Sequence, residues 1–335
     1  MSRLRLVTLY LSERCNSRCI TCDYWRHGRR DLSLEAVRDL VPALRRLGTE
    51  VALLSGGEPL LHPEWPQIAQ QLRAAGLRLW LLTSGLSLAK HSARIASLFD
   101  AVTVSLDGSC AQTYAAIRGL DAFDTVCAGI RAMVAAGIRP GLRVTVQRAN
   151  YRELPAFVAL AHALGAREVS FLAVDVANLH AFGRTEAAAF EAALTPSDLP
   201  EFDRCIDRLE QDCAQDFRSG FIAESPRKLR RMGGYFGALL GAREFAAPRC
   251  NAPEFSAVID ASQRVRPCFF IAGPEEAQLS ASAPLDEALE RPAMGALRGT
   301  IARGERRECA ACVCPLWRST AEPHATLMPE AVSAA

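Results

Sequence analysis

The chain has 335 residues, of which half are hydrophobic and 23% are charged, and its formal net charge is only +2. This length allows one barrel-sized domain with a smaller one, or two medium domains. The near-neutral charge gives no electrostatic reason to expect nucleic acid or an anionic membrane as a partner. No apolar run reaches the roughly 18 residues of a membrane-spanning helix, and the N-terminus lacks a signal-peptide cleavage pattern. We therefore expect a cytoplasmic protein.

Short β-prone runs alternate with helical patterns over the first half of the chain. Strands are expected at 4–11, 51–55, 77–83, 101–106, 142–147 and 168–174, and helices at 33–47, 64–75, 87–98, 111–136 and 151–164. Several strands are almost continuously apolar, such as LRLWLL, which indicates a parallel sheet covered on both faces. Six strand–helix units predict an α/β fold, an open partial (β/α)6 barrel with its chemistry at the carboxyl ends of the strands.

The pattern changes after residue 174. Residues 175–195 are rich in alanine around a central Phe-Gly-Arg, and 196–215 are predicted to be helical after a Thr-Pro-Ser start signal. From about residue 220 the regularity falls and prolines become more frequent. We place a domain boundary near 240, which divides a barrel (1–240) from a small C-terminal domain (241–316) and a tail (317–335) without a clear pattern.

The twelve cysteines are unevenly distributed. In a chain without an export signal, grouped cysteines more often bind metal or carry out redox chemistry than form disulfides. Three lie at 15–22, three at 309–314, and two between these groups at 250 and 268. This grouping predicts two separate metal sites. The four scattered cysteines are interpreted as small buried hydrophobic residues: Cys110, Cys127, Cys205 and Cys213.

Cys15, Cys19 and Cys22 form a C-x3-C-x2-C group directly after the first predicted strand. Thiolates are the usual ligands of iron–sulfur clusters, and three in one loop can hold one face of a cubane. Three ligands, rather than four, leave one iron open to a cofactor or substrate. The alternative is a zinc site, for which His27 is the only nearby fourth ligand.

This cysteine loop resembles the signature of the radical S-adenosylmethionine (radical SAM) superfamily. At the end of the second predicted strand, Gly56, Gly57, Glu58 and Pro59 resemble the GGE motif of that family. The resemblance implies a [4Fe–4S] cluster on the three cysteines, with SAM chelated to it and its methionine amino group held by the motif. The residue types suit this role, because glycine allows close backbone approach and a carboxylate can bond to an ammonium group.

Two further strand ends resemble the same family. Ser84 lies in a T-S-G turn where the family often has a T-N-G-like turn, and Ser105 and Asp107 lie in an S-L-D-G segment. The resemblance makes all three candidate contacts to the cofactor or substrate, although Asp-Gly also forms ordinary turns. Arg118 matches a common R-G pair, but an exposed arginine is usually only solvated. Thr21 stands where the family often has an aromatic residue near the adenine.

The C-terminal cysteines resemble those of the family's auxiliary-cluster domains, called SPASM and twitch. Cys250 and Cys268 flank a predicted hairpin at 255–268, and Cys309, Cys312 and Cys314 follow as C-x2-C-x-C. The resemblance implies a twitch-like domain with one auxiliary [4Fe–4S] cluster, for which we choose Cys250, Cys268, Cys309 and Cys312. Cys314, or Cys312 in its place, is the spare ligand, and a spare thiol could donate a hydrogen atom to a product radical. A structural zinc on four of these thiolates is the alternative.

The family resemblance implies reductive cleavage of SAM to a 5′-deoxyadenosyl radical, which abstracts a substrate hydrogen atom. We expect oxidation or epimerisation of a small metabolite such as a sugar, aminocyclitol or nucleoside, because only 14 residues precede Cys15 and leave no room for a fused peptide-recognition domain. Modification of a ribosomally made peptide is the alternative. A flavodoxin or ferredoxin is the implied electron donor. A non-catalytic iron–sulfur sensor is the competing class, and it would not need the Glu58 motif.

Overall fold

The structure is a computed structural model that describes residues 3–176, 178, 181–184, 190–246, 248–280 and 283–318. The strands of its sheet are β1 Leu6–Ser12, β2 Val51–Gly56, β3 Arg78–Thr83, β4 Ala101–Ser105, β5 Gly141–Val146, β6 Glu168–Ala173, β7 Ser256–Ile259 and β8 Val265–Arg266. Their order is β6-β5-β4-β3-β2-β1-β7-β8. All neighbours run parallel except β7 and β8, which form an antiparallel hairpin.

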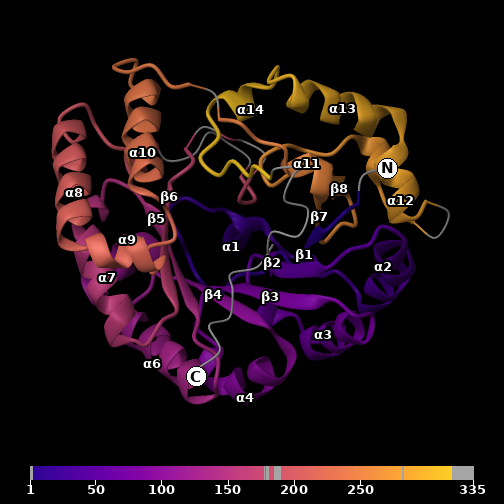
Figure 1. Cartoon of the computed structure of the whole chain (residues 1–335). Coiled ribbons are helices and arrows are strands. Elements are labelled where there is room, and N and C mark those ends of the chain that lie inside the picture. The colour runs from indigo at the N-terminus through magenta and orange to yellow at the C-terminus, as the bar shows by residue number, and fades with distance from the viewer. Residues whose placement is uncertain are drawn as a thin grey trace.

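The longer helices that follow the parallel strands cover the outside of this curved sheet. The helical elements of this part of the chain are α1 Tyr24–His27, α2 Leu34–Arg46, η1 Pro59–Leu61, α3 Trp65–Ala74, α4 Leu88–Leu98, α5 Ala111–Arg118, α6 Phe123–Ala135, η2 Tyr151–Glu153 and α7 Leu154–Ala163. Figure 1 shows α2, α3, α4, α6 and α7 around the outside, whereas the short α1 lies within the ring. The predicted open barrel of strand–helix units is therefore confirmed.

After β6 the chain adds helices beside the open edge of the sheet and above its other end. These are η3 Phe190–Ala192, α8 Leu199–Asp212, α9 Ala214–Ser219, α10 Pro226–Leu239, α11 Ala252–Phe255, η4 Glu275–Ala277, α12 Leu285–Glu290, α13 Pro292–Ala302 and α14 Arg307–Ala310. Figure 1 places α8 and α10 next to β6, and α12, α13 and α14 on the side of β7 and β8. Helices from the second half of the chain thus flank both ends of the sheet, α8 and α10 at β6 and α12 to α14 at β7 and β8.

The core lies between the sheet and the outer helices. On β5, Leu142, Val144 and Val146 are fully buried in it, as the period-two alternation of a strand allows. The inner face has its own smaller apolar cluster, made of Leu6, Val51, Leu53 and Ala101 with Trp80, Leu82 and Phe269 packed against it. The partial barrel is therefore filled along β1 to β4, and side chains of β5 between the core positions face the interior.

All six predicted barrel strands are present, each within two residues of its expected bounds. The single helix expected at 111–136 is wrong, because Gly119 adopts φ 74° and ends α5 before α6 begins. The helix expected at 196–215 is likewise divided into α8 and α9. The hairpin expected at 255–268 is present, and its first strand pairs with β1, which the sequence did not predict.

The described end of the chain is held by Asn251. The Asn251 amide accepts a hydrogen bond from Arg318 N at 2.9 Å, and the guanidinium of Arg249 lies 3.5 Å from the ring centroid of Trp317. The remainder of the predicted tail, 319–335, lies outside the described residues. Among the described helices, none is both long and apolar enough to cross a membrane.

Candidate functional site

The three N-terminal cysteines lie in the loop between β1 and α1, and the Gly-Gly-Glu turn is hydrogen-bonded to the start of this loop. Gly57 N donates to Ser12 O at 2.7 Å, and Glu58 N donates to Arg14 O at 2.8 Å. A Cβ on Gly57 would lie 2.4 Å from the carbonyl oxygen of Arg14, and Gly56 has φ 122°. These glycines are therefore needed for the cysteine loop to lie directly on the end of β2.

The loop is held in the same way from the opposite side. Arg18 N donates to Arg118 O at 2.9 Å, and Ile20 N donates to Ile117 O at 3.1 Å. A Cβ on Gly119 would lie 2.3 Å from the carbonyl oxygen of Arg18. The end of α5 and the end of β2 thus fix the backbone of the cysteine loop between them.

The carboxylate of Glu58 is buried and connects the ends of two strands. Its oxygens accept hydrogen bonds from Thr83 Oγ1 at 2.8 Å, Ser84 N at 2.7 Å and Leu60 N at 3.1 Å. Pro59 begins the turn η1 directly after it, where the missing amide hydrogen costs nothing. The described contacts of Glu58 are therefore within the protein, and they bring the Ser84 turn against the Gly-Gly-Glu turn.

Asp107 forms a buried ion pair with Arg118, at 3.0 Å. Its other oxygen accepts a hydrogen bond from Thr145 N at 2.7 Å. The expectation of a solvated Arg118 is wrong, because this side chain is only 10% exposed. Burial by itself lowers the pKa of the Arg118 guanidinium, but Cys19 and Asp107 raise the pKa overall. Arg118 therefore places a positive charge beside the cysteine loop. Ser105, the third predicted contact, is the last residue of β4.

A segment after β6, which sequence reasoning did not identify, lies against the cysteine loop. Arg184 donates to Thr21 O from Nε at 3.1 Å and from Nη2 at 2.8 Å, and it pairs with Asp175 at 3.3 Å. Phe182 O accepts hydrogen bonds from Asp23 N at 2.9 Å and from Cys22 Sγ at 3.3 Å. The only sequence signal was the Phe-Gly-Arg in an alanine-rich stretch.

The donor set of the loop fits a [4Fe–4S] cluster. Burial raises the pKa of Cys15 to about 11 and that of Cys22 to about 12, and it also raises the pKa of Cys19. Thiolate ligation therefore has to release protons from all three thiols. His27 is exposed, and within the described ranges no three His, Cys, Asp or Glu side chains converge closely enough to hold a single metal ion.

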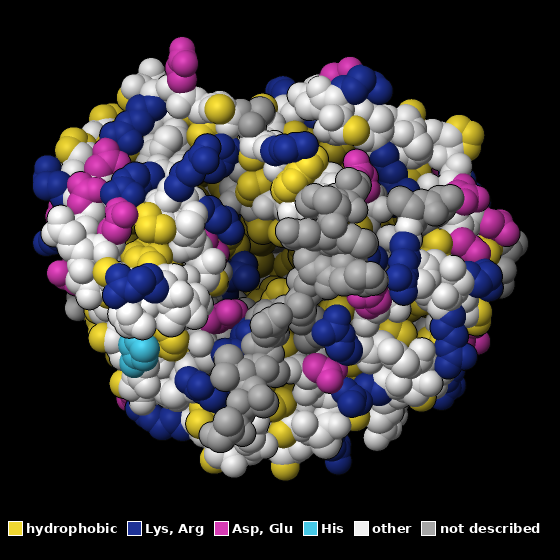
Figure 2. Space-filling view, in the orientation of Figure 1, with side chains coloured by type: hydrophobic (Ala, Val, Ile, Leu, Met, Phe, Trp, Pro, Cys, Tyr) yellow, Lys and Arg dark blue, Asp and Glu magenta, His cyan; other side chains and the backbone are white. Residues whose placement is uncertain are grey.

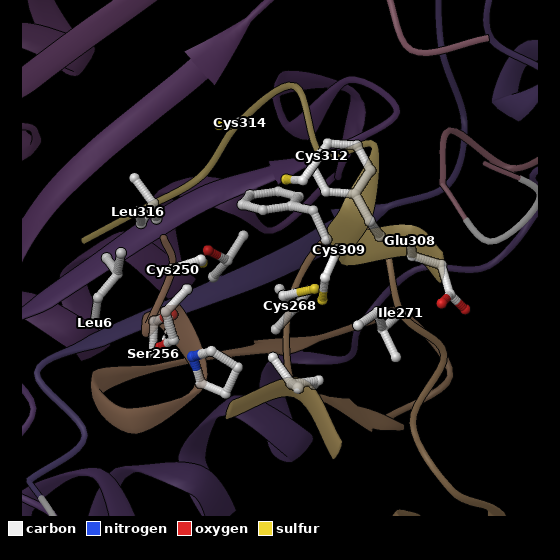
Figure 3. A pocket seen from close by; sticks show the side chains of 17 residues that line it. Leu6, Cys250, Ser256, Cys268, Ile271, Glu308, Cys309, Cys312, Cys314 and Leu316 are labelled. Atoms are coloured by element: carbon white, nitrogen blue, oxygen red, sulfur yellow. Dashed lines mark hydrogen bonds between the residues drawn. The ribbon is translucent and has the colours of Figure 1, made fainter. Parts of the chain in front are cut away.

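The five C-terminal cysteines line one cavity together with apolar residues of the barrel and the hairpin. Figure 3 shows Cys268 and Cys309 pointing toward each other, with Cys312 nearby. The Cys312 thiol lies within electrostatic range of Cys250 and Cys268 as well as Cys314. The structure thus brings together all the cysteines of this predicted group.

Cys314 differs from the other four in its surroundings. Burial raises its pKa, and among the charged groups Arg143, Lys228 and Glu224 affect this pKa more than Cys250 does. It therefore faces the barrel as well as the cysteine group. Of the scattered cysteines, three are buried as expected, but Cys110 is exposed because it precedes the first turn of α5 at the surface.

Three aromatic rings lie between the two cysteine groups. The ring centroid of Tyr10, on β1, is 6.1 Å from that of Tyr24 and 6.2 Å from that of Phe269. Burial raises the pKa of Tyr10 to about 12, and both Cys268 and Cys22 are close enough to raise it further. The two groups thus lie on either side of one buried ring.

Comparison with known proteins agrees with this geometry. Residues 9–161 match the family described as the Radical SAM superfamily. The chain is 32% identical over 161 residues to Fe-coproporphyrin III synthase of Methanosarcina barkeri, covering 46% of this chain and 40% of that protein. It is 34% identical over 186 residues to GTP 3′,8-cyclase 1 of Mycobacterium tuberculosis, covering 51% of each. The chain thus spans about half of the length of these curated relatives.

Solved structures show the same fold over most of the chain. SuiB of Streptococcus suis bound to precursor peptide SuiA superposes with a TM-score of 0.65 at 15% identity, covering 89% of this chain and 67% of that one. The protein anSMEcpe with bound AdoMet superposes with a TM-score of 0.67 at 16% identity, covering 92% and 89%. Residues 9–161 therefore form a radical SAM domain, which contains the cysteine loop and the Gly-Gly-Glu turn, and the five C-terminal cysteines lie beyond this matched range.

Proposed function

We propose that this protein cleaves SAM reductively and uses the product to abstract a hydrogen atom from a small metabolite, which is thereby oxidised or epimerised. The observation that carries the proposal is the direct hydrogen bonding of the Gly57 and Glu58 amides to the start of the cysteine loop. It joins the candidate SAM motif to the candidate cluster loop at the mouth of the barrel. When bound, the cluster and SAM supply the radical chemistry.

The chain's own residues have defined tasks in this proposal. Cys15, Cys19 and Cys22 hold the first cluster, and Arg118 places a positive charge beside Cys19. Glu58 organises the SAM site through its bonds to the ends of β2 and β3, and a carboxylate has room for one further donor, such as an ammonium. The backbone of the two glycines and the side chains of Ser84, Ser105 and Asp107 complete the SAM or substrate site.

The C-terminal part, 241–316, is proposed to hold an auxiliary [4Fe–4S] cluster. Cys250, Cys268, Cys309 and Cys312 are its ligands, because their thiols influence one another across one cavity. Cys314 is the spare cysteine, since charged barrel residues are its main neighbours. A cytoplasmic location and a flavodoxin or ferredoxin as electron donor remain part of the proposal.

The substrate class rests on indirect support. The curated relatives at 29–34% identity are named for small-molecule chemistry, such as GTP 3′,8-cyclase and AdoMet-dependent heme synthase. A peptide substrate is the second candidate, because SuiB and anSMEcpe are described as bound to peptides. Incubating the enzyme with candidate substrates of both kinds, and following 5′-deoxyadenosine above the substrate-free rate, separates the two.

The activity is tested first on anaerobically reconstituted protein with dithionite and SAM, by chromatography of 5′-deoxyadenosine. Glu58→Ala should abolish both SAM binding and this product, whereas Glu64→Ala, which removes an exposed carboxylate on the same segment, should not. A non-catalytic sensor would keep its cluster redox response in Glu58→Ala and bind no SAM in any form. Absence of SAM binding in fully reconstituted wild type would refute the proposal.

Cluster number has its own readout. Reconstituted wild type should hold about eight irons per chain, and the triple variant with Cys15, Cys19 and Cys22 changed to Ala should hold about four. Eight irons in the variant, or zinc in place of iron, would contradict the two-cluster assignment.

A further inference from the structure

The inner face of the sheet changes character at β5. Its apolar cluster lies along β1 to β4, whereas Arg143 of β5 is flanked in register by Ser105 of β4 and Ser170 of β6. Arg143 faces the interior because Leu142 and Val144, on either side of it, are buried in the outer core. Figure 2 shows a hollow in this face of the molecule, with hydrophobic side chains on its floor and Lys and Arg side chains on the wall nearest α10.

The guanidinium of Arg143 has no ion-pair partner in the part of the chain that the structure describes. Its Nε is buried without a hydrogen-bond partner there. Glu168 and Glu224 lie on the same wall, but their ion pairs are with other cations, since Glu168 pairs with Arg167 at 2.6 Å and Glu224 lies 3.5 Å from Lys228. Arg143 acts on Glu168 only electrostatically and has no ion pair of its own among the described residues.

Glu224 is satisfied without Lys228. Its carboxylate accepts hydrogen bonds from Ser170 Oγ at 2.8 Å and from Phe171 N at 2.7 Å, both on β6, the last strand of the sheet. The Lys228 side chain is 43% exposed, so its ammonium can leave Glu224 at low cost. Ser170 is the register neighbour of Arg143 on β6, so the Ser170–Glu224–Lys228 contacts place Lys228 near Arg143.

We propose that Arg143, assisted by Lys228, binds a carboxylate or phosphate group of the substrate. This inference rests on the proposed function and narrows its substrate to an anionic compound. A half-buried cation without a partner is costly, and an anion that enters with the substrate removes that cost. The planar guanidinium suits two-point binding of either oxyanion. Arg143 is paired in register with Ser105, which ends β4 and is proposed to contact the cofactor or substrate. The proposed anion site therefore lies beside the proposed site of the reaction.

The test measures binding of inorganic phosphate to the reconstituted full-length chain, by calorimetry at constant ionic strength. We expect saturable binding to wild type, about tenfold weaker binding to Arg143→Gln and a smaller loss in Lys228→Gln. Arg94→Gln, which removes an exposed arginine of the outer helix α4, should bind phosphate as wild type does. Equal binding to wild type and Arg143→Gln, or no saturable binding to wild type, would overturn the proposal.

Two further readouts separate this role from the alternatives. Without phosphate, Arg143→Gln should melt at the same temperature as wild type or higher, because it removes an unpaired charge. A lower melting temperature there would make Arg143 structural and overturn the proposal. A loss of SAM affinity equal to the loss of phosphate affinity would assign Arg143 to the cofactor and overturn it too. Failure of SAM cleavage in wild type is seen in the separate 5′-deoxyadenosine assay, so it is distinguishable from failure of the anion site.

Discussion

Replacing Gly57 with alanine tests how closely the cysteine loop and the Gly-Gly-Glu turn depend on each other. The new Cβ would lie 2.4 Å from Arg14 O and 2.5 Å from Glu13 O, and backbone atoms cannot move aside as a flexible side chain does. Overpacking of this kind costs about 1–3 kcal/mol. The loop must also stretch the Gly57–Ser12 and Glu58–Arg14 hydrogen bonds, each contributing about 1 kcal/mol. We expect a total destabilisation of about 3–5 kcal/mol if both hydrogen bonds are lost.

Urea denaturation of the cluster-free protein gives this difference, and iron content with SAM affinity after reconstitution gives its functional consequence. Gly295→Ala is the matched control. A Cβ there meets nothing within 4 Å, and alanine stabilises a helix interior such as that of α13 by about 0.5–1 kcal/mol. Gly57→Ala protein with unchanged unfolding free energy, four irons in the first site and wild-type SAM affinity would refute the coupling of loop and turn.

Two other substitutions follow from buried groups. Arg118→Met leaves Asp107 without its ion-pair partner and should destabilise the protein by about 3–5 kcal/mol. Adding Asp107→Asn should recover part of this loss in a double-mutant cycle of denaturation midpoints. Full additivity of the two substitutions would contradict the pairing. Burial lowers the pKa of His62, which lies 3.0 Å from Leu32 O and accepts a hydrogen bond from Glu64 N. Its stabilising effect is therefore present above its unfolded pKa of about 6.5 and is lost as the pH falls below that value. Urea denaturation between pH 5 and 8 should show a steeper acid loss in wild type than in His62→Gln, and parallel pH profiles would exclude this role.

The barrel strands could be predicted because their residues agree at several levels. Continuous apolar runs, turn residues and helix start signals such as Ser33, which caps α2, all indicate the same boundaries. The cysteine groups could be predicted for a different reason, since their spacing depends on ligand chemistry and not on packing. The division of 111–136 was missed because a single glycine inside a helical pattern is often tolerated, whereas Gly119 adopts φ 74° and lies against Arg18 O.

The rest of the site depends on contacts that no local pattern encodes. Arg118 is buried because Asp107 and the cysteine loop surround it, and sequence alone could only weigh it as an average arginine. Arg184 reaches Thr21 across more than 160 positions of sequence. Glu58 was predicted as a ligand to the cofactor, yet its described hydrogen bonds are to Leu60, Thr83 and Ser84. The Gly-Gly-Glu pattern identified Glu58 as a site residue, whereas its hydrogen-bond partners within the protein follow only from the fold.

The arrangement of charges along the inner wall suggests how one barrel can serve two binding tasks. Arg118 is neutralised by Asp107 and lies beside Cys19, so its charge is fixed before any ligand arrives. Arg143 lies two residues before Thr145, whose amide bonds to Asp107, but it lacks an ion-pair partner within the described chain. A paired cation holds a site together, whereas an unpaired one gains most of its stabilisation from what binds. In the proposed enzyme, the paired cation therefore suits the permanent cluster and its cofactor, and the unpaired one suits a substrate that enters and leaves.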